Sequence, residues 1–156
     1  NTFPLYLTNS CCSHPSSEKE ELNEEKGLGI KLAAIRRLTF ELGIKEKISP
    51  DELKLVTRMR YCAKYNEILG ENEIDYCFIL RKAVTLDPNP AEVDEIIYVE
   101  QKDFNNLIST SSLTPWFKFI CPNMLMSWWK NLDTIIARQD EKIPPIIDVG
   151  DISENS

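Results

Sequence analysis

The sequence predicts an α+β fold with a mixed sheet, and three patterns support this. Apolar residues recur at spacings of three and four over residues 28–42, which is typical of one face of an α-helix. Residues 53–65 alternate apolar and polar side chains, and residues 73–81 form a more continuous apolar run, as β-strands do. With 156 residues and 42% hydrophobic content, the chain is long enough for one packed domain and too apolar for intrinsic disorder.

Local signals define the N-terminal part of this fold. Residues 1–10 mix aromatic and aliphatic side chains and are broken by Pro4, which predicts an extended segment or an edge strand. The helix over residues 28–42 is expected to end at Gly43, because glycine suits the left-handed conformation of a C-terminal cap.

The second half of the chain is expected to complete the sheet and add two helices. The apolar run over residues 73–81 predicts a strand that is buried on both faces. A third short strand is expected at residues 96–99, followed by a short helix at residues 100–108. A last helix opens at Thr114-Pro115, and Pro122 is expected to kink it.

The acidic residues are concentrated in two segments. The formal net charge is −7, and residues 16–26 and 131–156 account for all of it, so the rest of the chain is formally neutral. An acidic chain is a poor candidate for binding nucleic acid or an anionic membrane by phosphate neutralisation. No run approaches the roughly 20 apolar residues that span a bilayer. We expect one domain over residues 1–143 and an acidic, disordered tail over residues 144–156.

Cysteine and histidine content limits the chemistry and suggests a compartment. The five cysteines are odd in number and form no Cys-x-x-Cys pair, which favours reduced thiols in a cytosol-like compartment. The chain ends without the Ser-Lys-Leu peroxisomal signal, so a cytoplasmic location is the first expectation and a peroxisomal one the alternative. His14 is the single histidine, so metal binding would depend mainly on carboxylates.

Three short segments hold side chains suited to proton transfer and metal binding: residues 12–14, 37–41 and 71–73. Glu71 and Glu73 lie two apart at the entrance to a strand, so their carboxylates share a face. Such a pair repels unless a cation lies between the two groups, one pKa is raised, or both are in solvent. Each segment alone has an ordinary structural interpretation, such as a solvated loop, a packed histidine, or an ion pair worth about 0.3–0.5 kcal/mol.

Six motifs occur together in a fixed order. They are TNSCCSHP at 8–15, AAIRRLTFELGI at 33–44, GENEIDY at 70–76, TLDPNP at 85–90, TPWF at 114–117 and Trp128-Trp129. In order and spacing they resemble the type 1 isopentenyl-diphosphate delta-isomerases, a branch of the Nudix fold. The resemblance covers nearly all of residues 2–132, and it implies a Nudix-type α/β/α sandwich.

The Nudix relationship is also visible in one helix, since residues 36–44 match the second half of the Nudix hydrolase box. Arg and Phe replace two of its glutamates there, and Leu28 and Leu22 stand where the box has Glu and Gly. A diphosphate hydrolase needs those carboxylates to hold magnesium and activate water. Their loss argues against hydrolysis and agrees with the isomerase branch.

The resemblance implies an activity and four catalytic side chains. Such enzymes convert isopentenyl diphosphate into dimethylallyl diphosphate in isoprenoid biosynthesis, by protonation and deprotonation through a tertiary carbocation. Cys12 would act on one face of the substrate and Glu73 on the other, with Tyr61 assisting. Trp116 would stack on the developing cation, because an indole face stabilises a desolvated positive charge by about 2 kcal/mol or more.

The resemblance also implies metal ions. His14, Glu71 and Glu73 would ligate one divalent cation, for which Mg²⁺, Mn²⁺ and Zn²⁺ are all suitable. Glu41, the remaining box carboxylate, would hold a second Mg²⁺ that bridges to the substrate diphosphate.

Two further residues would act on the diphosphate. Ser13 and Arg37 would contact it, although an ion pair with Glu41 is the alternative for Arg37.

The chain departs from the family pattern at its start. It opens at Asn1 without methionine, and the family places two metal-binding histidines and several basic residues before this point. The family also usually has Gly where this chain has Leu5, so the turn before the cysteines is expected to differ. We therefore expect a fragment that is weakly active or inactive alone. A Nudix-type diphosphate hydrolase and a non-catalytic binding relative are the alternative functions.

Overall fold

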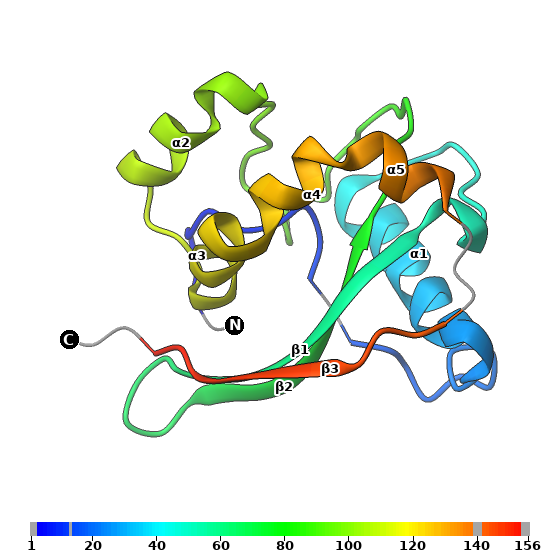
Figure 1. Cartoon of the computed structure of the whole chain (residues 1–156), viewed down its shortest axis with the longest axis horizontal. Coiled ribbons are helices and arrows are strands. Elements are labelled where there is room, and N and C mark those ends of the chain that lie inside the picture. The colour runs from blue at the N-terminus through cyan, green and yellow to red at the C-terminus, as the bar shows by residue number, and fades with distance from the viewer. Residues whose placement is uncertain (1–2, 13, 139–141, 154–156) are drawn as a thin grey trace.

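The computed structural model describes residues 3–12, 14–138 and 142–153, and it confirms the α+β class. Five α-helices accompany one three-stranded sheet within these residues (Figure 1). The elements in chain order are α1 (Leu28–Leu42), β1 (Lys54–Lys64), β2 (Gly70–Ile79), α2 (Gln101–Thr110), α3 (Pro115–Ile120), α4 (Met126–Lys130), α5 (Leu132–Ala137) and β3 (Ile146–Asp151). None of the described helices is long and apolar enough to cross a membrane.

Helix α1 confirms the prediction from the apolar spacing. It ends at Gly43, which adopts the left-handed conformation with a φ of 63°. The backbone of Asp87 lies where a side chain on residue 43 would be, so glycine is required there for two reasons. At the other end of α1, the carbonyl of Glu21 packs against Gly29 in the same way. Glycine thus lets the acidic segment before α1 lie directly on the helix.

The sheet is mixed, as predicted, with β1 in the middle. β2 pairs with β1 in the antiparallel sense, and β3 pairs with it in the parallel sense. In the β1–β2 register, Tyr61 lies opposite Glu73. The predicted burial of the second strand on both faces is wrong, because β2 is an edge strand of the described sheet and its residues are at most half-buried.

Two further predictions, a strand at residues 96–99 and a disordered tail at residues 144–156, are corrected. Residues 96–99 form no strand; Ile97 and Tyr98 are exposed, and the stretch is part of the connection to α2. The tail expected over residues 144–156 contains β3 instead. β3 forms backbone hydrogen bonds with the edge of β1 that faces away from β2. Just beyond β3, the backbone amide of Ile152 donates to the carbonyl of Cys62 over 2.8 Å. Backbone pairing of this kind needs no apolar sequence pattern.

The last helix is interrupted, as the position of Pro122 predicts. Proline lacks an N–H group, and here it lies in a π-helical turn over Cys121–Leu125 between α3 and α4. The expected helix at 100–108 is α2. The N-terminal segment is extended only in part, since a single parallel bridge joins Leu7 to Leu113.

Two apolar clusters hold these elements together. The first packs Trp116 and Phe117 of α3 and Phe104 of α2 against Met59 and Tyr61 of β1. The second packs α1 against the loops around it, and its buried members are Leu42, Ile44, Ile48 and Leu53. In Figure 1 the hairpin of β1 and β2 runs between α1 on one side and α2 to α5 on the other. The candidate site lies between these two groups of helices.

Candidate active site

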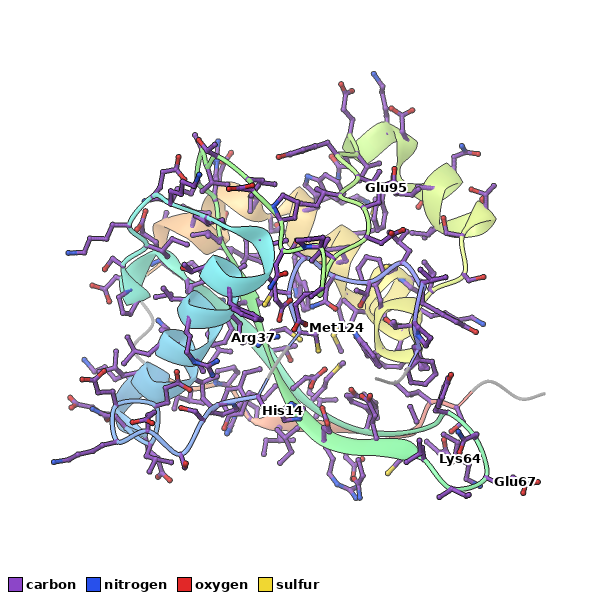
Figure 2. All side chains as sticks on the ribbon, turned by 180° about the vertical axis from the view of Figure 1, so that it is seen from behind. His14, Arg37, Lys64, Glu67, Glu95 and Met124 are labelled. Atoms are coloured by element: carbon purple, nitrogen blue, oxygen red, sulfur yellow. The ribbon has the colours of Figure 1, made fainter. Side chains whose placement is uncertain are left out.

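The segment formed by residues 8–12 and His14 brings the predicted site together, because Asn9 contacts Trp116 of α3 and His14 contacts Glu73 of β2. In Figure 2, His14 lies over the middle of the hairpin with Arg37 of α1 close by, whereas Lys64 and Glu67 lie at the far end of the hairpin. The site therefore has four sides: this segment, the hairpin, α1 and α3.

The contact between His14 and Glu73 joins the segment to β2. The imidazole Nε2 atom lies 2.9 Å from Glu73 Oε1. The His14 side chain is 77% exposed and that of Glu73 is 26% exposed, so the pair is open to solvent on the histidine side. The sequence predicted these two residues to act on one metal ion, and the structure places them in direct contact.

A row of carboxylates follows one face of β2. Glu71, Glu73 and Asp75 alternate with more exposed neighbours and share the face that looks toward Tyr61. The Tyr61 hydroxyl donates to Glu71 Oε2 over 3.3 Å. Burial and the nearby charges of Asp75, Glu71 and Glu73 raise the pKa of the fully buried Tyr61, so its phenol stays protonated and remains a donor.

Asp75 was missed by the sequence analysis. Burial raises its pKa to about 7, the carboxylates of Glu73 and Glu71 add to the rise, and His14 opposes it. The carboxyl of Asp75 thus keeps its proton to a higher pH than an ordinary aspartate does. The signal was present in the motif, because Asp75 continues the two-residue spacing of Glu71 and Glu73.

The Cys12 thiol belongs to the same electrostatic neighbourhood. Cys12 is an exposed residue, yet local desolvation of its sulfur raises the pKa of the thiol, and the charges of Asp75, Glu73 and Glu71 raise it further. A thiol in these surroundings keeps its proton at neutral pH, which makes it a poor nucleophile and a neutral carrier of a proton. The preceding thiol, Cys11, faces α1, where burial and a hydrogen bond with Glu41 raise its pKa to about 12.

Trp116 forms the side of the site that belongs to α3. Its indole is buried, with 6% exposure, and its centroid lies 6.3 Å from that of Tyr61. The indole N–H donates to Thr8 Oγ1 over 3.1 Å and to Asn9 Oδ1 over 3.0 Å. The segment that carries Cys12 and the aromatic wall of the site are therefore connected by hydrogen bonds.

Several known proteins are similar in sequence to most of this chain. Isopentenyl-diphosphate Delta-isomerase 1 from Mesocricetus auratus is 46% identical over 149 residues, which cover 91% of this chain and 66% of that protein. The Bos taurus protein of the same name is 42% identical over 86% of this chain and 62% of its own length. The chloroplastic Isopentenyl-diphosphate Delta-isomerase I of Arabidopsis thaliana is 41% identical over 90% of this chain and 52% of its own length.

The chain belongs to the isopentenyl-diphosphate Delta-isomerase family. No protein-family model matches it. The chain spans about two thirds of the length of the Mesocricetus auratus and Bos taurus relatives. The family resemblance drawn from the six motifs is therefore confirmed at the level of sequence.

In this member of the family, α1 forms the fourth side of the site. Arg37 donates to Glu41 Oε1 over 2.8 Å and also reaches Glu92 Oε2 at 3.4 Å. The ion pair considered for Arg37 is therefore present, and its side chain is only 20% exposed. Glu41 also contacts Cys11, so the two residues predicted on α1 lie beside the cysteine segment. Ser13 lies outside the described residues.

A charged contact on the far side of His14 was also missed by the sequence analysis. Arg36 binds both oxygens of Glu21, at 2.5 and 3.0 Å, and donates to the backbone carbonyl of His14 over 3.2 Å. The amide of Ser16 donates to Glu21 over 2.6 Å. Glu21 is buried at 8% exposure, and these contacts lower its pKa to about 2. Partners 15 residues apart give no periodic signal in a sequence.

The metal-binding prediction fits the chemistry of the donors but only part of the geometry. Imidazole and carboxylate groups suit Mg²⁺, Mn²⁺ or Zn²⁺. However, His14 and Glu73 contact each other, and Glu71 accepts from Tyr61. Within residues 3–12, 14–138 and 142–153, no three histidine, cysteine or carboxylate side chains are grouped so that they could hold an ion. A metal ion at this place would therefore need donors beyond those that the described residues bring together.

Proposed function

We propose that this chain catalyses, alone or as part of a longer protein, the isomerisation of isopentenyl diphosphate to dimethylallyl diphosphate. The observation that carries the proposal is the place of the Cys12 thiol, beside the carboxylates of β2, which raise its pKa, and on the segment that Asn9 joins to Trp116. The printed names of the relatives support the same reaction. A Nudix-type fold is part of the proposal, supported by Arg37 and Glu41 at matching positions on α1.

The reaction moves a double bond, so one carbon must gain a proton while another loses one. Cys12 and Glu73 would perform these transfers from opposite faces of the substrate, with the Cys12 thiol entering the cycle protonated and Glu73 as a carboxylate group of the hairpin. The Tyr61 hydroxyl would steady the carboxylate row through Glu71. The Trp116 indole would stabilise the tertiary cation by about 2 kcal/mol or more.

The diphosphate end of the substrate calls for positive charge, and the guanidinium of Arg37 is already paired with Glu41 and Glu92. We propose that His14, Glu71 and Glu73 hold one divalent cation together with further donors, and that Glu41 helps to hold a Mg²⁺ at the diphosphate. When bound, such ions supply charge neutralisation of the diphosphate. Arg37 and Ser13 would bind the diphosphate directly. Because the described ligand set is partial, we expect weak turnover by this chain alone.

The location of the protein follows from its cysteines. All five thiols are free, and Cys12 would need to stay reduced to carry a proton. We therefore propose a reducing compartment, with the cytoplasm as the first choice.

The reaction is tested most sensitively in D₂O. Each protonation of the alkene by an exchangeable group would place solvent deuterium in the product, so mass spectrometry detects even slow turnover. Cys12→Ala and Glu73→Gln should each reduce deuterium incorporation to background in a form of the protein that turns over. A matched control is Cys62→Ala, which removes a thiol one residue beyond Tyr61 on the opposite face of β1. Activity within about tenfold of the parent, a loss of under about 1.4 kcal/mol, would contradict the role of the altered residue.

The role of Trp116 has its own test. Trp116→Phe keeps an aromatic face, and Trp116→Ala removes it, so the alanine variant should lose far more activity. Equal losses would argue against stabilisation of a cation by the ring. Release of inorganic phosphate or diphosphate without alkene migration would instead support the hydrolase alternative.

A further inference from the structure

We infer that Asn9 is a positioning residue that fixes the backbone of Cys12 relative to the Trp116 indole. Both polar atoms of the Asn9 side-chain amide make hydrogen bonds. Asn9 Oδ1 accepts from Trp116 Nε1 over 3.0 Å, and Asn9 Nδ2 donates to the carbonyl of Cys11 over 2.6 Å. The inference rests on the proposed function, in which Cys12 and Trp116 act on the same substrate.

The carbonyl of Cys11 is the informative partner. It belongs to the peptide unit that joins Cys11 to Cys12, and that unit is planar. Holding this oxygen therefore sets the orientation of the plane that ends at the Cys12 Cα atom. The φ torsion and the side-chain torsion of Cys12 then decide where the thiol lies, so the anchor limits the position of the thiol without touching it.

The other end of the contact is rigid. Trp116 follows Pro115 in the first turn of α3, and its ring is buried in the first apolar cluster. Thr8 reinforces the arrangement, because its hydroxyl lies 2.9 Å from Asn9 Oδ1 and 3.0 Å from the hydroxyl of the buried Thr114. One bridge between Leu7 and Leu113 runs beside these contacts. The Cys12 segment is thereby aligned on the start of α3.

Both contacts require an amide side chain at position 9. The oxygen must accept from an indole N–H, and the nitrogen must donate to a carbonyl, so the orientation of the amide is fixed by its partners. Aspartate at this position would keep the contact with Trp116 but would place a carboxylate oxygen against the Cys11 carbonyl. Alanine would remove both contacts. The two variants therefore separate the two halves of the anchor.

The anchor can be tested without turnover by ¹H–¹⁵N correlation spectra of the chain. Asn9→Asp should shift or broaden the Cys12 backbone amide while the Trp116 indole signal keeps its protection from solvent exchange. Asn9→Ala should change both signals. The matched control is Asn123→Asp, because Asn123 Nδ2 also donates to a backbone carbonyl, that of Phe119, over 2.7 Å, on the surface. A Cys12 amide that responds equally weakly to Asn9→Asp and Asn123→Asp would overturn the inference.

Kinetics test whether the alignment matters for the reaction. In a protein that turns over, Asn9→Asp should lower kcat at least tenfold and change KM by less than twofold, because the thiol is misplaced and the substrate grip is intact. A kcat within twofold of the parent would overturn the positioning role. If the spectra show the anchor but no form of the protein isomerises the substrate, the proposed function fails and the link between Cys12 and Trp116 stands.

Discussion

The segment that carries Cys12 and His14 is held at its two ends by contacts of different kinds. At the upstream end, neutral hydrogen bonds of Thr8 and Asn9 reach the buried indole of Trp116. At the downstream end, Arg36 reaches the His14 carbonyl while it pairs with the buried carboxylate of Glu21. One end is thus independent of protonation, and the other depends on a charge.

The difference between the two ends matches two separate structural roles of the segment. The end near Cys12 places a proton-carrying thiol, and neutral contacts keep that placement constant while nearby groups gain and lose protons. The end near His14 joins the segment to α1, and a bidentate arginine–carboxylate pair gives a strong and directional connection there. Each end therefore predicts a different response to pH and mutation.

The charged end should give the largest change. Glu21→Gln should lower the free energy of unfolding at pH 7 by about 2 kcal/mol, a value discounted because Arg36 is 42% exposed. The folded-state pKa of Glu21 is depressed from 4.5 to about 2, so its contribution is complete above pH 4.5 and is lost as the pH falls toward 2. Urea unfolding between pH 7 and pH 2 should show this loss in the parent chain.

The same titration separates Glu21 from its neighbours. Glu21→Gln should flatten the stability profile between pH 4.5 and pH 2, whereas Glu20→Gln, at an exposed position one residue away, should leave that slope in place. An identical slope in both variants would show that the pair with Arg36 does not hold the acidic segment on α1.

The neutral end should give a smaller loss with no pH dependence. Trp116→Phe removes the indole donor to Thr8 and Asn9 and should cost about 1–1.5 kcal/mol. The urea midpoint of the variant should lie below that of the parent by an equal interval at pH 7 and at pH 4, because none of the groups in this contact titrates. Trp129→Phe, where the ring packs on Phe104 at 5.5 Å, corrects for the loss of ring size. A loss no greater than that of Trp129→Phe would show that the upstream hydrogen bonds contribute little.

The same division explains what the sequence could predict. Contacts with a short period were found: the stripe of α1, the alternation of β1, and the shared face of Glu71 and Glu73. The family resemblance then predicted roles for Cys12 and Tyr61, and in the structure these two residues are electrostatic neighbours. The parts that were missed depend on partners far apart in sequence, since strand β3 pairs 88 residues away and Glu21 reaches across 15 residues to Arg36.

Asp75 shows a different limit. Its position on the face of Glu71 and Glu73 was readable from the spacing, but its raised pKa depends on the burial of this one side chain beside two carboxylates, whereas the apolar run predicted burial of the whole strand on both faces. The expected strand at 96–99 failed for the converse reason. Apolar residues there had a strand-like composition, yet no strand among the described residues supplies the backbone partners that a strand requires.

The smallest effect concerns the turn just before the neutral end. Leu5 stands where the family usually has glycine, and it adopts the left-handed conformation with a φ of 65° while its side chain is 88% exposed. A residue with a side chain in that conformation costs about 1–2 kcal/mol. Replacing it with glycine removes this strain, but part of the gain in stability is lost because glycine has greater conformational freedom in the unfolded chain. Leu5→Gly should therefore raise the free energy of unfolding by about 0.5–1 kcal/mol in urea titrations, whereas Lys19→Gly at another exposed position should lower it. A destabilised Leu5→Gly variant would mean that Leu5 contributes packing to the upstream end that outweighs its backbone strain.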